Sequence, residues 1–202
     1  KLESTFRNLA ERIAARTLAR LPISPLALTV TGAVLSIGVA VLLAVGHFRW
    51  GAALMVFGAL FDMADGALAR VTQRQSDLGA FLDSTLDRYS EALIGMGLLL
   101  YLLQQAAWLD IVLLYLFLTG SLLFSYARAR AEAAGFANRG GLFTRPVRLM
   151  ILTVGLFAGQ LRIVLWILAI GVQLSAFYRI LDVCVAARRK MDCDPKVQLP
   201  GS

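Results

Sequence analysis

The sequence has few charged residues, two cysteines and a single histidine, and each shortage excludes a class of protein. Only 16% of its 202 residues are charged, whereas about a quarter is usual in a soluble domain. Because 58% of the residues are hydrophobic and the mean hydropathy is +0.71, a water-soluble globule of this size would lack polar surface. We therefore expect much of the apolar surface to face lipid.

Cys184 and Cys193 are too few for a disulfide framework, and their spacing from His47 fits no metal site, so we interpret both as reduced and structural. The net charge of +7 and the pI near 10.0 would suit nucleic acid in a polar chain. In a membrane chain, a basic excess more often reflects the positive-inside rule and anionic lipid headgroups. We expect no nucleic-acid partner.

The apolar runs predict an all-α, polytopic membrane protein with six transmembrane helices and no separate soluble domain. The expected spans cover about 25–45, 50–69, 77–103, 108–130, 145–160 and 163–187. Residues 1–21 place apolar side chains along one helical stripe and most arginines elsewhere, which predicts an amphipathic interfacial helix. The predicted organisation is thus an interfacial helix over 1–21, a transmembrane domain over 22–190 and a polar tail over 191–202.

The distribution of Lys and Arg predicts the orientation. If the N-terminus is placed inside, sixteen of the twenty basic residues lie on the inner side. Only Arg49 and Arg162 lie outside, while Arg88 and Arg179 fall within spans. The positive-inside rule then predicts a protein of the cell (inner) membrane with both termini in the cytoplasm.

Four aspartates are expected to converge at the cytoplasmic ends of the second and third spans. Asp62 and Asp65 are spaced i, i+3 and share one helical face, as do Asp83 and Asp87 at i, i+4. The intervening loop is short, so the two helices should be antiparallel neighbours. One ionised aspartate at membrane depth costs a few kcal/mol, and four together also repel one another.

A cationic partner is therefore needed among the aspartates. Mg²⁺ or Mn²⁺ fits best, because these ions prefer carboxylates, phosphates and water, and no His or Cys cluster indicates zinc. Two ions bridged by shared carboxylates would neutralise all four aspartates. The alternatives are helix capping, pairing with nearby arginines, or a cation-conducting path.

The aspartates belong to the pattern Asp-x2-Asp-Gly-x2-Ala-Arg-x8-Gly-x3-Asp-x3-Asp, in which eight positions are fixed over 26 residues. It is filled by Asp62, Asp65, Gly66, Ala69, Arg70, Gly79, Asp83 and Asp87. In this pattern, and in its six spans with a preceding interfacial helix, the chain resembles the CDP-alcohol phosphotransferases. The resemblance implies transfer of a phosphatidyl group from CDP-diacylglycerol to an alcohol, with release of CMP, in a cavity open to the cytoplasm.

The resemblance also implies a role for each position. Asp62, Asp65 and Asp83 would be metal ligands, and Asp87 would be the general base and possible ligand of a second ion. The nucleotide and its pyrophosphate would be held by Gly66, Ala69, Arg70, Gly79 and Thr29. Glycines leave room for the nucleotide against the helices, and Arg70 would help neutralise the pyrophosphate.

The acceptor is predicted from the later spans. Asp87 is followed by Arg88, and the segments 126–132 and 145–148 look like those of the bacterial phosphatidylinositol phosphate synthases. Their acceptor is inositol phosphate, whose phosphate dianion needs a basic pocket. By this resemblance, Arg128, Arg148 and Arg188 would bind the acceptor phosphate, although the positive-inside rule alone also places arginines there.

Other functions and partners remain open at this point. Val147 replaces an acidic residue usual in the inositol branch, and Leu26 replaces a common Asn, so glycerol 3-phosphate is an alternative acceptor, with phosphatidylglycerol phosphate as the product. Two further alternatives are a divalent-cation channel or carrier and a non-catalytic nucleotide-lipid binding protein. The resemblance also implies a homodimer, for which Gly95, Gly97 and Gly120 would permit close helix packing.

Overall fold

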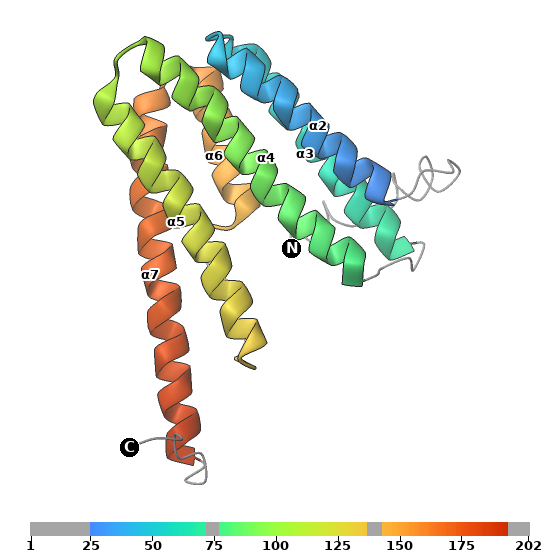
Figure 1. Ribbon diagram of the computed structural model, residues 1–202, viewed down its shortest axis with the longest axis vertical. Helices are drawn as coiled ribbons and strands as arrows, with labels where there is room; N and C mark the ends of the chain where they lie inside the picture. The colour runs from blue at the N-terminus through green and yellow to red at the C-terminus, as the bar shows by residue number, and fades with distance from the viewer. Residues whose placement is uncertain (1–24, 72–76, 137–142, 194–202) are drawn as a thin grey trace. The chain divides into compact units, whose positions relative to one another are not determined.

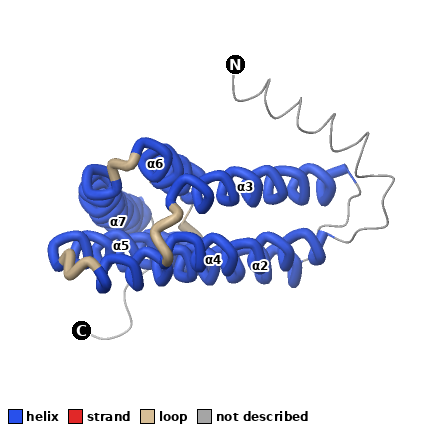
Figure 2. The backbone as a smooth tube through the Cα atoms, turned by 90° about the horizontal axis from the view of Figure 1, so that it is seen from above, coloured by secondary structure: helices blue, strands red, loops and turns tan. Residues whose placement is uncertain are grey.

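The computed structural model describes residues 25–71, 77–136 and 143–193, and these ranges contain helices and turns but no strand (Figures 1 and 2). The helices are α2 (Pro25–Ala44), α3 (Phe48–Val71), α4 (Asp77–Gln104), α5 (Trp108–Ala133), α6 (Arg145–Ala158) and α7 (Leu161–Cys193). The all-α prediction is confirmed for this part of the chain. The predicted interfacial helix over 1–21 lies outside the described residues, as does most of the predicted tail.

Glycines in the left-handed region end three of the described helices: Gly46 follows α2, Gly135, with φ of 76°, follows α5, and Gly159 follows α6. After α2, Gly46 has φ of 81°, its N–H donates to Leu43 O, and the N–H of His47 donates to Leu42 O at 2.8 Å. After α6, Gly159 has φ of 69° and the same pair of hydrogen bonds is formed. These are Schellman motifs, which satisfy carbonyls that the helix end leaves without partners.

The chain divides into two compact units. The first comprises 1–108 and 153–160 and contains α2, α3 and α4. Gly51 of α3 packs against Leu43 of α2, and Leu54 further along α3 packs against Gly38 further back on α2, so these helices are antiparallel. Helix α4 runs parallel to α2, because Gly97 faces Ala40 and Tyr101 faces Gly46 further along both helices. The buried core here includes Val39, Leu43, Ala52, Leu98 and Leu102.

The second unit comprises 109–152 and 161–202, with α5, α7 and the first half of α6. Three side-chain contacts join α5 and α7 in matching order: Arg162 to Asp110, Gln173 to Leu116 O and Arg179 to Phe124 O. Because the contact positions increase together on both helices, α5 and α7 are parallel. The core of the second unit includes Leu114, Phe117, Leu165, Leu168 and Val172.

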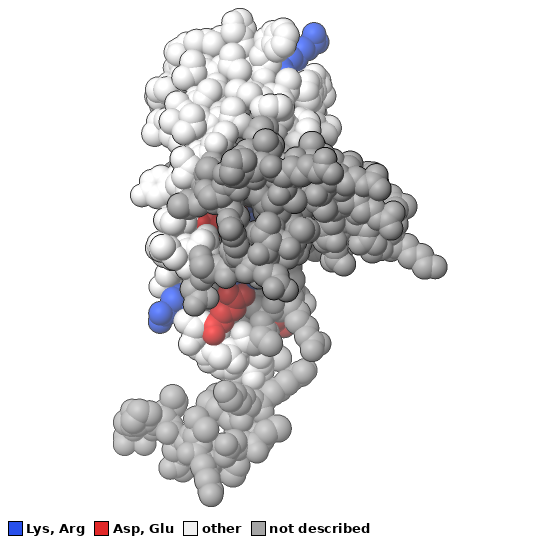
Figure 3. Space-filling model, turned by 90° about the vertical axis from the view of Figure 1, so that its right-hand side faces the viewer, with Lys and Arg blue, Asp and Glu red and all other residues white. Residues whose placement is uncertain are grey.

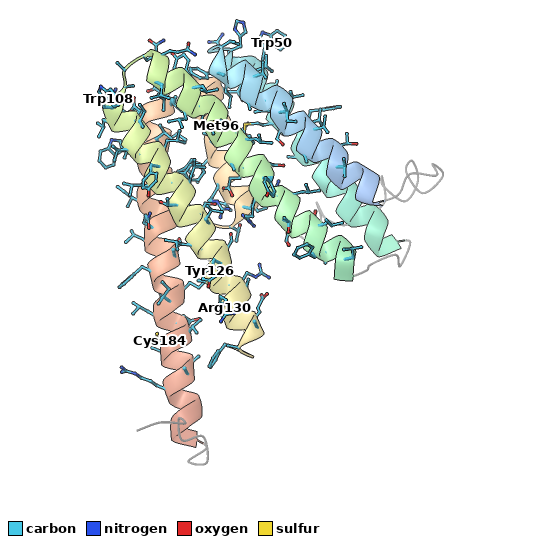
Figure 4. All side chains as sticks on the ribbon, viewed as in Figure 1. Trp50, Met96, Trp108, Tyr126, Arg130 and Cys184 are labelled. Carbon is cyan, nitrogen blue, oxygen red and sulfur yellow. The ribbon has the colours of Figure 1, made fainter. Side chains whose placement is uncertain are left out.

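Large apolar side chains are exposed along the helices, as lipid contact requires. Val34 and Val41 on α2 are each 59% exposed, and the face in Figure 3 carries few charged side chains among its described residues. Trp50 lies in the first turn of α3 and Trp108 is the first residue of α5, and both are exposed (Figure 4). Tryptophan is enriched at membrane–water interfaces.

Two described helices are long and apolar enough to cross a membrane, Trp108–Ala133 and Leu161–Arg188. Shorter apolar stretches cover Val30–Ala44 and Phe48–Leu60. Helix α4 is long, but acidic residues in its first half lower its hydropathy, and α6 has only 14 residues. The six predicted segments are helices, with α6 ending at Ala158 rather than Gln160.

The glycines expected to permit close helix packing in a dimer are buried within a single chain. A Cβ on Gly97 would lie 2.7 Å from Ala40 Cα, and a Cβ on Gly120 would lie 3.1 Å from Gln173 Cδ. Gly95 is also buried. Gly97 and Gly120 therefore permit close helix packing within one chain, and the homodimer remains a prediction.

Candidate functional site in the first unit

The candidate acidic site is carried by the end of α3 and the start of α4, which precede and follow residues 72–76 in the sequence. On α4, Asp83 is exposed and Asp87 is half-buried, one helical turn further on. On α3, the helix continues through Asp62 and Asp65 to Val71, but the side chains of residues 61–71 lie outside the described part. The same applies to Gly66, Ala69 and Arg70, and to the side chain of Thr29 on α2.

The donor chemistry fits a hard divalent cation. The helical register places Asp83 and Asp87 on one face of α4, and positions 62 and 65, spaced i, i+3, share one face of the α3 backbone helix. All four residues offer oxygen ligands, which Mg²⁺ and Mn²⁺ prefer. Among the side chains that the structure describes, no three His, Cys, Asp or Glu residues gather into a group that could hold a metal ion; Asp62 and Asp65 lie outside that part.

A partly buried ion pair lies beside Asp87. Arg88 Nη1 donates to Glu91 Oε2 at 3.2 Å, and the Glu91 side chain is only 6% exposed. Glu91 follows Asp87 by four residues, so the acidic stripe of α4 continues one turn deeper than the motif. The sequence reasoning missed Glu91, although a carboxylate at i+4 from Asp87 was a visible signal.

Candidate functional site in the second unit

The three arginines predicted to bind the acceptor phosphate differ in their environments. Arg128 is exposed on α5, and its Nε donates to Glu132 Oε1 at 2.8 Å. Arg148 on α6 is 0% exposed, and its Nη1 donates to Phe143 O at 2.8 Å. Arg188 is exposed near the end of α7. Tyr126 and Arg130, from the same segment as Arg128, are exposed on the last turns of α5 (Figure 4).

A further arginine, Arg179 on α7, was assigned no role by the sequence. It is 4% exposed, and its guanidinium carbon lies 3.7 Å from the ring centroid of Phe124 on α5. The signal that could have found it is its place within a long apolar helix. Ionisable residues in such segments are expensive and usually functional.

Comparisons with known proteins bear on this arrangement. The model of the CDP-alcohol phosphatidyltransferase family matches residues 23–185. The phosphatidylinositol phosphate synthase of Mycobacterium bovis BCG is 35% identical over 195 residues, which cover 93% of this chain and 89% of the relative.

Two solved structures are similar to the fold described above. The crystal structure of Mycobacterium tuberculosis phosphatidylinositol phosphate synthase with CDP-DAG bound has a TM-score of 0.79 and 32% identity. The match covers 87% of this chain and 94% of that one. The same enzyme in complex with manganese and citrate has a TM-score of 0.77 and 31% identity, over 86% of this chain and 88% of that one.

The chain belongs to the CDP-alcohol phosphatidyltransferase family, as the match over 23–185 and the intact eight-position pattern show. The predicted enzyme class is thereby confirmed. The manganese in the solved relative agrees with the predicted dependence on a divalent cation.

Proposed function

We propose that the protein transfers a phosphatidyl group from CDP-diacylglycerol to a hydroxyl of inositol phosphate, forming phosphatidylinositol phosphate and releasing CMP. The observation that carries this proposal is the intact acidic pattern on α3 and α4, with Asp83 and Asp87 on one face of α4, in a chain 35% identical to a phosphatidylinositol phosphate synthase. Arg88 directly after Asp87 supports the inositol branch.

In the proposed reaction, the acceptor hydroxyl oxygen attacks the lipid-side phosphorus of the pyrophosphate. A new phosphorus–oxygen bond forms, the bond to the CMP oxygen breaks, and the hydroxyl proton passes to the Asp87 carboxylate. Asp62, Asp65 and Asp83, with Asp87, would hold two Mg²⁺ or Mn²⁺ ions. Bound ions would supply positive charge to the pyrophosphate and the leaving group.

The nucleotide and pyrophosphate would contact Arg70, Gly66, Ala69, Gly79 and Thr29. Arg70 supplies a cationic fork for phosphate oxygens, and residues without bulky side chains let the nucleotide approach the helices. Arg128, Arg148 and Arg188 would bind the phosphate of the acceptor. A dianionic phosphate suits several guanidinium groups better than a neutral polyol does.

The proposed setting is the inner membrane, with six transmembrane helices, an interfacial helix over 1–21 and a polar tail over 191–202. Exposed apolar surface on the described helices supports membrane insertion. The charges of the acidic site itself lower the hydropathy of α3 and α4. Both termini and the site would face the cytoplasm, and the active form would be a homodimer.

The test uses the purified full chain in detergent with radiolabelled CDP-diacylglycerol and Mg²⁺. Inositol phosphate, free inositol and glycerol 3-phosphate are offered in parallel, each with and without EDTA. We expect a labelled phospholipid and equimolar CMP with inositol phosphate only, abolished by EDTA and restored by excess Mg²⁺ or Mn²⁺. Product from glycerol 3-phosphate alone would overturn the acceptor assignment, and turnover in EDTA would overturn the metal assignment.

A further inference from the structure

A buried carboxylate, that of Glu91, lies on the core-facing stripe of α4 in the first unit. Glu91 is 5% exposed, and the buried residues Gly95, Leu98 and Leu102 continue the same stripe at helical spacing. Asp87 of the acidic pattern lies one turn before Glu91 on that face. Glutamate is almost never fully buried unless it is paired, and an ionisable residue inside a membrane helix is expensive. The position of Glu91 therefore needs an explanation beyond packing.

Glu91 pairs with Arg88, three residues earlier on the same helix. Arg88 Nη1 donates to Glu91 Oε2 at 3.2 Å, and the Arg88 side chain is 29% exposed. Such a pair is weak evidence for stability, because taking the charges out of water offsets much of their attraction. The more informative feature is the position that the pair gives to the Arg88 guanidinium.

The pair draws the Arg88 side chain away from the acidic pattern. Side chains of an α-helix lean toward its N-terminus. For Arg88, that direction leads back to the turn that carries Asp83 and Asp87, whereas Glu91 follows Arg88 in the sequence. The hydrogen bond to Glu91 therefore holds the guanidinium against the ordinary direction of a helical side chain.

A guanidinium and a divalent cation compete for the same carboxylate oxygens. Mg²⁺ and Mn²⁺ bind through oxygen ligands, and a guanidinium donates charge-assisted hydrogen bonds to those oxygens. A positive charge close to the ligands also repels an incoming cation, most strongly where water is scarce. An Arg88 side chain that leaned toward Asp83 and Asp87 would weaken metal binding in both ways.

We infer that Glu91 is a positioning residue of the metal site, which holds Arg88 and so keeps its guanidinium from competing with a divalent cation for Asp83 and Asp87. This inference rests on the proposed function, in which these two aspartates are metal ligands. Glu91 acts through Arg88 and not as a ligand. Loss of Glu91 alone should therefore weaken metal binding, whereas loss of both charges of the pair should not.

The experiment measures Mn²⁺ binding to the purified full chain in detergent, without substrates, by electron paramagnetic resonance. The unchanged protein is compared with Glu91→Gln, with Glu91→Asp and with a double variant that carries Arg88→Gln and Glu91→Gln. Asp110→Asn is the matched control, because Asp110 is 6% exposed and also pairs with an arginine, Arg162, but lies in the second unit. The melting temperature of each protein is recorded in parallel.

We expect Glu91→Gln to raise the Mn²⁺ dissociation constant by about tenfold, because it leaves the charge of Arg88 unbalanced beside the ligands. The double variant should bind Mn²⁺ within about twofold of the unchanged protein, because both charges are gone. Glu91→Asp keeps the charge but shortens the side chain by one methylene, so a rise of about threefold is expected. Asp110→Asn should leave the dissociation constant unchanged, even if it lowers the melting temperature.

An unchanged dissociation constant in Glu91→Gln would overturn the inference, and so would a rise that the double variant does not reverse. An equal rise in Asp110→Asn would also overturn it, because the effect would then follow from the loss of any buried carboxylate. If Glu91→Gln does not fold, Glu91→Asp decides: a rise supports the inference and an unchanged constant overturns it. Failure of the proposed function is a different result, in which the unchanged protein itself releases no CMP with inositol phosphate as the acceptor.

Discussion

At the scale of single residues, Asp83 and Asp87 share a helical face but not an environment. Asp83 is exposed, whereas Asp87 is half-buried and directly precedes Arg88, which pairs with Glu91. A proton acceptor needs a fixed position relative to the attacking hydroxyl, while a metal ligand at the rim can remain in contact with solvent. The difference in burial supports the proposed division of roles, with Asp87 nearest the chemistry.

The first prediction concerns Asp87→Asn. We expect CMP release to fall by at least about 100-fold, because the amide can neither accept the acceptor proton nor carry the ligand charge. The rate is measured with saturating CDP-diacylglycerol and inositol phosphate. The matched control is Asp182→Asn, which removes an exposed carboxylate of α7 outside the pattern and should retain the rate. Full turnover by a folded Asp87→Asn protein would show that Asp87 is not the base.

Sequence spacing could predict that Asp83 and Asp87 share a helical face, but it could not predict the contact between Arg179 and Phe124. A helix repeats every 3.6 residues, so i, i+4 spacing fixes Asp83 and Asp87 on one face before any tertiary contact is known. The contact between Arg179 and Phe124 depends on how α5 and α7 align. Local patterns do not determine that alignment, because it depends on side-chain packing along the whole helix pair.

At the scale of helices, the close approach of α2 and α4 depends on glycine at position 97, which has no side chain. A Cβ on Gly97 would lie 2.7 Å from Ala40 Cα and 2.8 Å from Ala40 C. Backbone atoms cannot move aside as the end of a flexible side chain can. The two helices must therefore separate if any other residue occupies position 97, which would alter the helix that carries Asp83 and Asp87.

The second prediction follows from this crossing. Gly97→Ala should destabilise the protein by about 1–3 kcal/mol, because overpacking a tight contact forces backbone shifts. Thermal unfolding in detergent measures the change. Gly58→Ala on α3 is the matched control: a Cβ there would meet nothing within 4 Å, so the helix propensity of alanine should leave stability equal or higher. Equal melting temperatures for Gly97→Ala and the unchanged protein would contradict the close contact.

Helix positions were largely predictable from the sequence, while helix ends depended on local turn geometry. The apolar runs predicted the six described helices, since long hydrophobic segments between turn residues leave few alternatives. The prediction ran to Gln160, but Gly159 adopts a positive φ and ends α6 at Ala158. The sequence did not predict which helix packs against Gly97. A small residue at this position could equally have packed against a second copy of the chain.

At the scale of the whole molecule, charge distribution predicts which helix ends face the cytoplasm. Arg49 lies at the start of α3 and Arg130 near the end of α5, and both are exposed. The positive-inside rule counts Lys and Arg near the span ends, and it places Arg49 outside and Arg130 inside.

The third prediction tests that orientation in intact cells or right-side-out vesicles. In a Cys184→Ser, Cys193→Ser background, Arg49→Cys should react with a membrane-impermeant maleimide added outside. Arg130→Cys should react only after the membrane is permeabilised. Each labelled fraction is compared with labelling in detergent, and the background without cysteine controls for nonspecific reaction. The opposite pattern of labelling would reverse the proposed topology.

Helix α7 is longer than a bilayer's hydrocarbon region requires. Its 33 residues, at a rise of 1.5 Å each, span about 50 Å, against a hydrocarbon thickness of about 30 Å. About two thirds of the helix is enough to cross the apolar layer, so the remainder can stand among headgroups and water. The part of the helix that stands in water would then meet the water-soluble inositol phosphate. This acceptor would reach the membrane-bound donor without entering the hydrocarbon region.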